Sequence, residues 1–172
     1  MSFKTLHITN AWHPQSGGIR TFYLALLDAA NEARQPMHLV VPAEADGVDR
    51  IGDYGVIHRV KAPLAPGSKS YRMLFPNRYL WPGGRVNKII RDEQPDLVEF
   101  CDKYTLNYLG GLLRIGFLPG IDFRPTVVGL SCERFTESVR NYLSAGPVGG
   151  WLAGFYLRWL YFPLADHHIA VS

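Results

Sequence analysis

Apolar runs of five to seven residues recur along the chain, and each is apolar almost throughout. Runs of this length and character are typical of strands that are buried on both faces of a sheet. A proline closes the second run, as is expected where a strand stops. The pattern therefore predicts six strands, at residues 3–9, 37–42, 54–60, 97–101, 126–130 and 167–172.

Between these runs, apolar residues recur at the three- and four-residue spacing of a helix with one buried face. The clearest case follows Gly17 and Gly18 and comprises Ile19, Phe22, Tyr23, Leu26, Leu27 and Ala30. Further helices are predicted at 85–94, from Asp102 with Leu106, Leu109, Leu113 and Phe117 facing inward, at 131–143, and at 148–165. Alternation of short apolar strands with helices predicts a single α/β domain over 1–172. We expect a Rossmann-like, doubly wound and mainly parallel sheet with helices on both faces.

Residues 148–165 are apolar on nearly every side, which is unusual for a helix of a small domain. The stretch barely reaches the length of a membrane span, and it contains Arg158 and Pro163. A spanning helix is therefore not expected. The ordinary interpretation is a core helix, and the alternative is a face that docks on a partner or a membrane surface.

Composition narrows the class of protein. With 172 residues, 47% hydrophobic and 19% charged, the chain is expected to be globular. A net charge of +3 without any run of Lys and Arg does not favour nucleic-acid binding. Cys101 and Cys132 lack zinc-site or Cys-x-x-Cys spacing, and no charged segment followed by an apolar one marks a signal peptide. We expect a cytoplasmic protein with reduced thiols, with the inner face of the membrane as an option.

The Gly17-Gly18 pair stands between the first predicted strand and the first predicted helix. Backbone N–H groups at the start of a helix lack partners within the helix, and the helix dipole makes that end positive. Glycines allow a ligand to approach the backbone and allow positive φ, so this turn suits a phosphate. A plain tight turn is the alternative.

Ligands of doubly wound sheets bind outside the carboxyl ends of the strands. That edge is expected to hold Gly17-Gly18, Cys101-Asp102 and the turn at 131–134. A long irregular stretch at 61–82 carries four prolines, and loops of that length are often functional. The alternative is a surface excursion with a short helix around 71–79.

Four motifs, in this order and spacing, resemble the amino-terminal half of a GT-B-type retaining glycosyltransferase of glycosyltransferase family 4. They are Pro14-x-x-Gly17-Gly18 after the first strand, Pro95-Asp96-Leu97-Val98 at the start of another, Val127-Val128 leading to a Ser-x-Glu-Arg turn, and Ala165-Asp166-x-x-Ile169-Ala170-Val171-Ser172.

The resemblance implies two Rossmann-like domains facing each other across a cleft. The amino-terminal domain mainly holds the acceptor, and the carboxy-terminal domain binds the nucleotide-sugar donor and carries a glutamate pair. This sequence ends about where the family passes to its second domain. The resemblance therefore implies an acceptor-binding half whose donor domain is absent and which is inactive alone. It also implies transfer without a metal or any cofactor other than the nucleotide-sugar co-substrate.

Family roles carry over to matching positions only. Gly17, Gly18 and Ile19 correspond to the turn that approaches the donor's phosphates and sugar. A family histidine follows the strand that ends at Leu130, and Cys132 stands in its place beside Glu133 as the candidate catalytic pair. Because a thiol cannot supply the imidazole hydrogen bond, either the role has moved or the acceptor is unusual; a buried structural thiol is the alternative. The candidate acceptor-binding residues are His13, Arg20, Tyr71, Arg72, Asp102, Ser131 and Arg134.

Each acceptor candidate also has an ordinary explanation. Arg20 suits a solvated helix face, His13 a solvent-facing loop, and Tyr71 and Arg72 an ordinary surface loop. Asp102 suits a helix cap. The expected partners are a nucleotide sugar and a glycan or lipid-linked acceptor, with a peripheral membrane contact as an option and no nucleic acid.

Two other classes of function remain open at this stage. A non-catalytic interaction or membrane-surface module would use the apolar face at 151–162. A dinucleotide-binding oxidoreductase domain would need a G-x-G-x-x-G turn and an acidic residue closing the second strand, whereas here the glycines are adjacent and Glu44 follows a proline-containing stretch.

Overall fold

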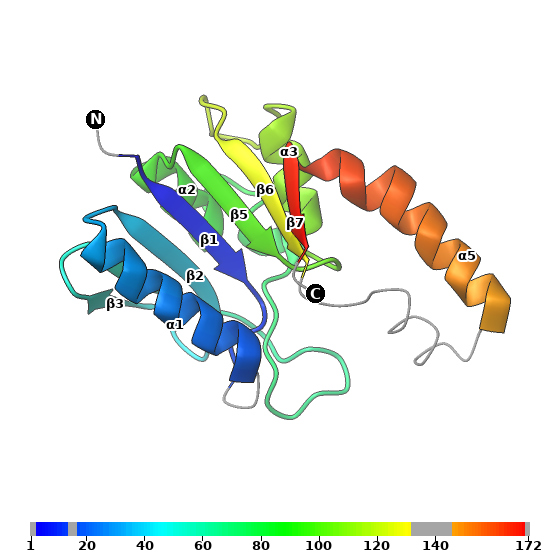
Figure 1. The fold of residues 1–172 in the computed structure, drawn as a ribbon, viewed down its shortest axis with the longest axis horizontal. Helices are drawn as coiled ribbons and strands as arrows, with labels where there is room; N and C mark the ends of the chain where they lie inside the picture. The colour runs from blue at the N-terminus through cyan, green and yellow to red at the C-terminus, as the bar shows by residue number, and fades with distance from the viewer. Residues whose placement is uncertain (1–2, 14–16, 132–145, 171–172) are drawn as a thin grey trace.

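The computed structural model describes residues 3–13, 17–131 and 146–170, and its centre is a seven-stranded sheet (Figure 1). The strands are β1 (Thr5–Thr9), β2 (Met37–Ala43), β3 (Gly47–Ile51), β4 (Gly55–Lys61), β5 (Leu97–Cys101), β6 (Thr126–Ser131) and β7 (His167–Ala170). The helices are α1 (Gly17–Glu32), α2 (Arg85–Glu93), α3 (Asn107–Arg114) and α5 (Gly146–Tyr156). A π-helical segment (Leu157–Tyr161) and a 3₁₀ turn (Phe162–Leu164) continue α5, and another 3₁₀ turn is formed by Pro76–Arg78.

The strand order is β3-β4-β2-β1-β5-β6-β7, and every neighbouring pair is parallel except β3 with β4. Without β3 this is the order of a doubly wound Rossmann sheet, in which the chain reverses direction across the sheet between β1 and β5. The prediction of a mainly parallel, Rossmann-like sheet is thus confirmed.

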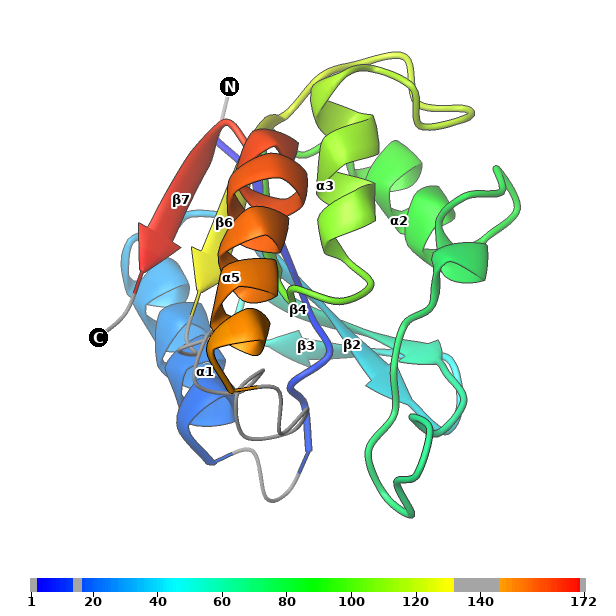
Figure 2. The ribbon, with the colours of Figure 1, turned by 90° about the vertical axis from the view of Figure 1, so that its right-hand side faces the viewer.

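Helices cover both faces of the sheet, but unequally (Figures 1 and 2). On one face α1 is the helix that the structure describes, and its Tyr23 and Leu27 pack on Leu39, Val41 and Ile57. On the other face α2, α3 and the segment after α5 enclose the larger part of the core. That part centres on Leu6, Ile8, Val40, Val60, Val86, Ile90, Val98, Phe100, Leu109, Val127 and Tyr161.

Strand β3 was not predicted. Its sequence Gly-Val-Asp-Arg-Ile is largely polar and exposed, so it lacks the apolar run by which the other strands were found. It pairs antiparallel with β4 at the edge of the sheet, where one side of a strand meets solvent. An ion pair between Arg59 Nε and Asp49 Oδ2 at 2.8 Å joins the two strands.

Another prediction at the level of elements is wrong. Phe117 does not face the core: α3 ends at Arg114, and Phe117 is 73% exposed. The short helix that was the alternative for 71–79 is present as the 3₁₀ turn Pro76–Arg78.

The interpretation of 148–165 as a core helix is also wrong for the side chains that the structure describes. Ala153 and Tyr161 are buried, but six large apolar side chains are about half exposed or more. They are Trp151, Leu152, Phe155, Trp159, Leu160 and Phe162, which we call the α5 patch. Figure 1 shows why: α5 extends beyond the sheet, so only one side of it meets the domain. Within the described ranges, no helix has both the length and the apolar character needed to cross a membrane.

Candidate functional site

The point where the sheet reverses direction brings the carboxyl ends of β1 and β5 side by side, with Thr9 opposite Cys101. A small hollow of about 60 Å³ opens there. Its lining comes from five segments, namely Ala11 after β1, Ile19 in α1, Tyr71 in the long loop, residues 101–104 at the end of β5, and Leu130 of β6. Three predicted site residues, Ile19, Tyr71 and Asp102, thus share one hollow.

A larger hollow of about 610 Å³ lies beside the first. Trp12, His13 and Glu44 line one part of it, and Leu64, Lys69, Ser70 and Arg72 line another. The His13 and Tyr71 rings, 6.3 Å apart between centroids, join the two hollows. Both hollows are lined by aromatic rings and polar groups, and we call the two together the carboxyl-edge site.

Asn10 holds this site together, although sequence reasoning did not single it out. Its side chain is buried, and its Nδ2 donates to Asp102 Oδ2 at 3.2 Å and to Thr105 Oγ1 at 2.9 Å. Its Oδ1 accepts a 2.7 Å bond from the backbone N–H of Leu74. Asn10 therefore ties the end of β1 to the end of β5 and fixes the long loop over both.

The Asp102 carboxylate accepts hydrogen bonds from the turn that precedes α3. Its Oδ2 accepts bonds from the backbone N–H groups of Thr105 and Leu106 and from Thr105 Oγ1, and its Oδ1 accepts one from Tyr104 N–H. The expected capping role thus applies to residues 104–106, while α3 itself begins later, at Asn107, without a side-chain cap.

The long loop at 61–82 is ordered by its own hydrogen bonds. Ser68 Oγ accepts from Tyr71 N–H at 2.8 Å, and Ala65 N–H donates to Tyr71 O at 2.7 Å. Arg72 donates to Ala62 O at 2.8 Å and to Glu44 Oε1 at 2.9 Å. The guanidinium that was predicted to pair with an acceptor therefore already has an acidic partner, and it braces the loop against the end of β2.

Gly17 and Gly18 form the first turn of α1, next to the site. Neither glycine adopts the positive φ that glycine allows, since the glycines with positive φ in the described ranges are at 52, 67, 116 and 120. A Cβ added at Gly17 or at Gly18 would meet no atom within 4 Å. The described part of the chain thus gives no steric reason for glycine at either position.

Other predicted residues lie around this edge. The Arg20 guanidinium lies 5.4 Å from the centre of the Trp12 ring, so Arg20 is held by a cation–π contact. Ser131 closes β6 and pairs with Ala170 of β7. Cys101 is a buried thiol. Cys132, Glu133 and Arg134 lie outside the described residues, so the candidate catalytic pair remains a prediction.

A buried polar network beneath α1 was also missed. Glu99 in β5 accepts a 2.5 Å bond from the Tyr23 hydroxyl and lies 3.0 Å from His7 Nδ1. Burial and the neighbouring Glu99 carboxylate raise the pKa of Tyr23 well above its usual range, so the phenol remains a donor. The one signal in the sequence was a carboxylate inside an apolar strand.

The comparisons with known proteins were sparse. No family model matches the chain, and no curated protein does. Among solved structures, the chain is similar to the catalytic domain of starch synthase IV from Arabidopsis thaliana bound to ADP and acarbose, with 10% identity and a TM-score of 0.47. The match covers 77% of this chain and 34% of that chain, so the chain spans about a third of that structure's length. The fold class is defined by the strand order of the sheet.

Proposed function

We propose that this chain is the acceptor-side domain of a retaining glycosyltransferase that moves a sugar from a nucleoside-diphosphate sugar to an acceptor hydroxyl. The proposal includes a donor-binding domain that follows Ser172 in the complete enzyme. The main support for the proposal is the position of the α1 amino terminus. It lies at the carboxyl-edge site, where the chain reverses direction across the sheet.

The first turn of α1 is suited to the donor's phosphates. Its N–H groups are free of helical partners by position, and no acidic residue in the first turn opposes an anion. The open space beside Gly17 and Gly18 lets a diphosphate reach the backbone itself. In a transfer reaction, these dipoles offset the charge that develops on the leaving diphosphate.

The carboxyl-edge site is suited to an acceptor sugar, which has apolar ring faces and a rim of hydroxyl groups. Tyr71, Tyr104 and Trp12 supply rings, while Ser70 and Lys69 supply hydrogen-bonding groups. Closure of the second domain over this surface would exclude water and align the acceptor hydroxyl with the donor.

The decisive experiment replaces Gly18 by Val in the complete enzyme and follows transfer of labelled hexose from UDP-, GDP- and ADP-hexoses. Since the added side chain points into open space in this structure, the fold should be kept while the approach of the diphosphate is blocked. We expect kcat/KM to fall roughly 100-fold or more, as when one preorganised donor to a developing anion is lost.

Gly154→Val is the matched control, because Gly154 is also a helical glycine with open space around its Cβ, and it lies in α5. Transfer by this variant should stay within about twofold of the wild type. Normal turnover by Gly18→Val would refute the assigned role of the turn. Transfer by residues 1–172 alone would refute the need for a second domain.

The oxidoreductase alternative is tested by titrating the chain with NADH and following its fluorescence. Glu44 is the nearest acidic residue after β2. It forms an ion pair with Arg72, so its carboxylate is engaged and does not await a ribose hydroxyl. We expect no saturable NADH signal, and a saturable one would favour the dinucleotide-binding class.

A second candidate function, docking on a membrane surface, is favoured by the α5 patch. Trp151 and Phe155 stack at 5.9 Å between ring centroids, and both are about half exposed or more. Aromatic side chains of this kind are enriched at the interface between lipid and water. A domain held at the membrane surface would have a lipid-linked acceptor within reach.

Co-sedimentation with phosphatidylcholine–phosphatidylglycerol vesicles tests this docking. The double variant Trp151→Ala and Trp159→Ala should lose most of the bound fraction, whereas Trp81→Ala, which removes a similarly exposed indole elsewhere, should keep it. Binding through the α5 patch should persist at high salt, since Arg158 is its one nearby charge in the described helix. Equal binding by all three proteins would contradict the role of the patch.

A further inference from the structure

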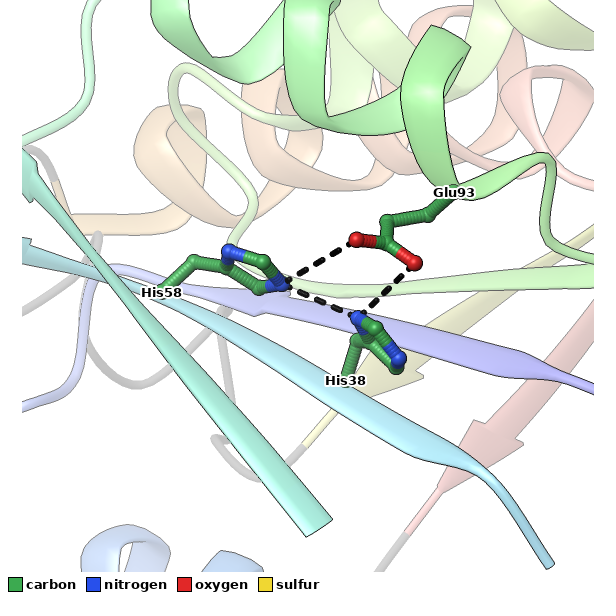
Figure 3. A group of neighbouring side chains, drawn as sticks. All are labelled: His38, His58 and Glu93. Carbon is green, nitrogen blue, oxygen red and sulfur yellow. Dashed lines mark hydrogen bonds and ion pairs between the residues drawn. The ribbon is translucent and has the colours of Figure 1, made fainter. Parts of the chain in front are cut away.

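Three metal-ligating side chains meet at the opposite edge of the sheet from the carboxyl-edge site. His38 is the second residue of β2, His58 lies on the neighbouring strand β4, and Glu93 ends α2 (Figure 3). In the strand register His38 lies opposite Val56, so the two histidines are diagonal neighbours on one face. The cluster shares no residue with the carboxyl-edge site.

The distances between the facing atoms suit one metal ion. His38 Nδ1 lies 2.9 Å from His58 Nε2 and 3.4 Å from Glu93 Oε2, and His58 Nε2 lies 4.0 Å from Glu93 Oε1. A tetrahedral ion with bonds of about 2.0–2.1 Å places its ligand atoms ~3.3 Å apart. The three measured separations lie on both sides of that value, so small side-chain rotations bring all three groups to an ion.

Both imidazoles are held in the uncharged form that binds a metal. Burial lowers the pKa of His58 to about 4, with His38 and Arg85 adding to the shift and Glu93 opposing it. Burial also lowers the pKa of His38; Glu93 opposes this shift, and the positive charges of Lys4 and Arg50 add to it. A neutral imidazole offers a lone pair to a metal, and an ion between the rings would replace the hydrogen bond between their facing nitrogens.

Neighbouring contacts orient the groups of the cluster. His58 turns its Nε2 toward His38 and Glu93, while its buried Nδ1 has no hydrogen-bond partner among the described residues. Lys4 Nζ holds Glu93 through its Oε2 at 3.2 Å and its backbone carbonyl at 2.8 Å, which orients the carboxylate toward the rings. Contacts that orient a ligand in this way are usual around metal sites.

The cluster also has access to solvent. A hollow of about 370 Å³ is lined by all three residues together with Arg50, Asp53 and Tyr54. Three protein ligands leave a fourth tetrahedral position, and the hollow can supply it with water or another small ligand. Asp53 adds a carboxylate to the lining of this hollow, and Arg50 adds a guanidinium.

We propose that His38, His58 and Glu93 bind one Zn²⁺ ion, with the fourth coordination position open to the adjoining hollow. Two imidazoles with one carboxylate favour zinc over magnesium or calcium, which prefer oxygen ligands. The site is independent of the proposed transfer reaction and joins the start of β2, the middle of β4 and the end of α2.

The test titrates the chelator-treated chain with ZnCl₂ by calorimetry at neutral pH, with MgCl₂ as the comparison. We expect one Zn²⁺ per chain and no saturable heat from Mg²⁺. Co²⁺ should give the intense visible absorption of a four-coordinate site. His58→Gln should weaken zinc binding by about 10-fold or more, since loss of even a group that orients a metal ligand costs roughly 10- to 100-fold.

His167→Gln is the matched control, because His167 is an exposed strand histidine on β7 and should bind zinc as the wild type does. If His58→Gln does not fold, as judged by circular dichroism, Glu93→Gln supplies the second variant, since the Glu93 side chain is partly exposed at a helix end. The proposal is overturned by the absence of saturable binding in the wild type. It is equally overturned by unchanged affinity in folded Glu93→Gln, or by loss of binding in His167→Gln.

Discussion

The two edges of the sheet differ in how their buried polar groups are satisfied. At the carboxyl edge, Asn10 and Asp102 are bonded to backbone and side-chain partners on three segments. At the amino edge, His38 and His58 bond mainly to each other and to Glu93. A saturated network holds loops in place, whereas an unsaturated one can accept a ligand. Hydrogen bonding at one edge therefore builds a scaffold, and at the other it leaves ligand atoms available.

The largest effect on stability is expected where the scaffold is broken. Asn10→Ala leaves the buried Leu74 N–H without its acceptor and removes one donor from Asp102. We expect the free energy of unfolding to fall by about 3 kcal/mol, measured by urea denaturation, because unpaired buried groups cost about 1–3 kcal/mol each.

The exposed Asn77, in the same long connection between β4 and α2, provides the control for this measurement. Asn77→Ala should change stability by about 0.5 kcal/mol or less. A cost below about 1 kcal/mol for Asn10→Ala would show that the carboxyl edge does not depend on this residue, and the contrast between the edges would fail.

A smaller effect is expected from the histidines, and it depends on pH. Because the folded-state pKa values of His38 and His58 lie below the unfolded value of 6.5, the unfolded state binds more protons as the pH falls. The stabilisation is present above pH 6.5 and is lost as the pH falls toward about 4. With chelator present, we expect the wild type to lose about 1–2 kcal/mol more over this window than His38→Gln/His58→Gln, allowing for screening by the solvent-filled hollow.

Equal pH slopes for the two proteins would mean that the rings are not held uncharged by the fold. Arg50→Gln sharpens the same measurement, since Arg50 contributes to the lowered pKa of His38. Removing this charge raises the folded-state pKa of His38 toward 6.5. The lower limit of the pH window should therefore move to higher pH, and the total loss of stability should become smaller.

Much of the fold could be predicted because buried parallel strands are apolar throughout. The strand at 97–101, for example, was placed at its observed bounds. Strand β3 could not be found in this way, since it is a polar edge strand that is defined by its pairing with β4. The exposure of Trp151 and Trp159 was not predicted as the main interpretation, because an apolar sequence does not reveal how far a helix extends beyond its sheet.

The candidate sites divide in the same way. That Ile19 and Asp102 meet at one edge follows from strand–helix alternation, which places the end of every parallel strand on the same side. Asn10 resembles any polar residue after a strand, and only the structure shows its three bonds. His38 and His58 are twenty residues apart, and their contact depends on β3 lying outside β4, so that β2 and β4 become neighbours.

The Tyr23–Glu99 hydrogen bond has a consequence for local opening of the domain. Among the described residues, α1 packs in a different core cluster from α2 and α3, so α1 can detach without unpacking them and is a candidate for a separate cooperative unit. Detachment would break the Tyr23–Glu99 bond and leave the Glu99 carboxylate with His7 as its remaining described partner. That hydrogen bond therefore opposes local opening of the helix that carries Gly17 and Gly18.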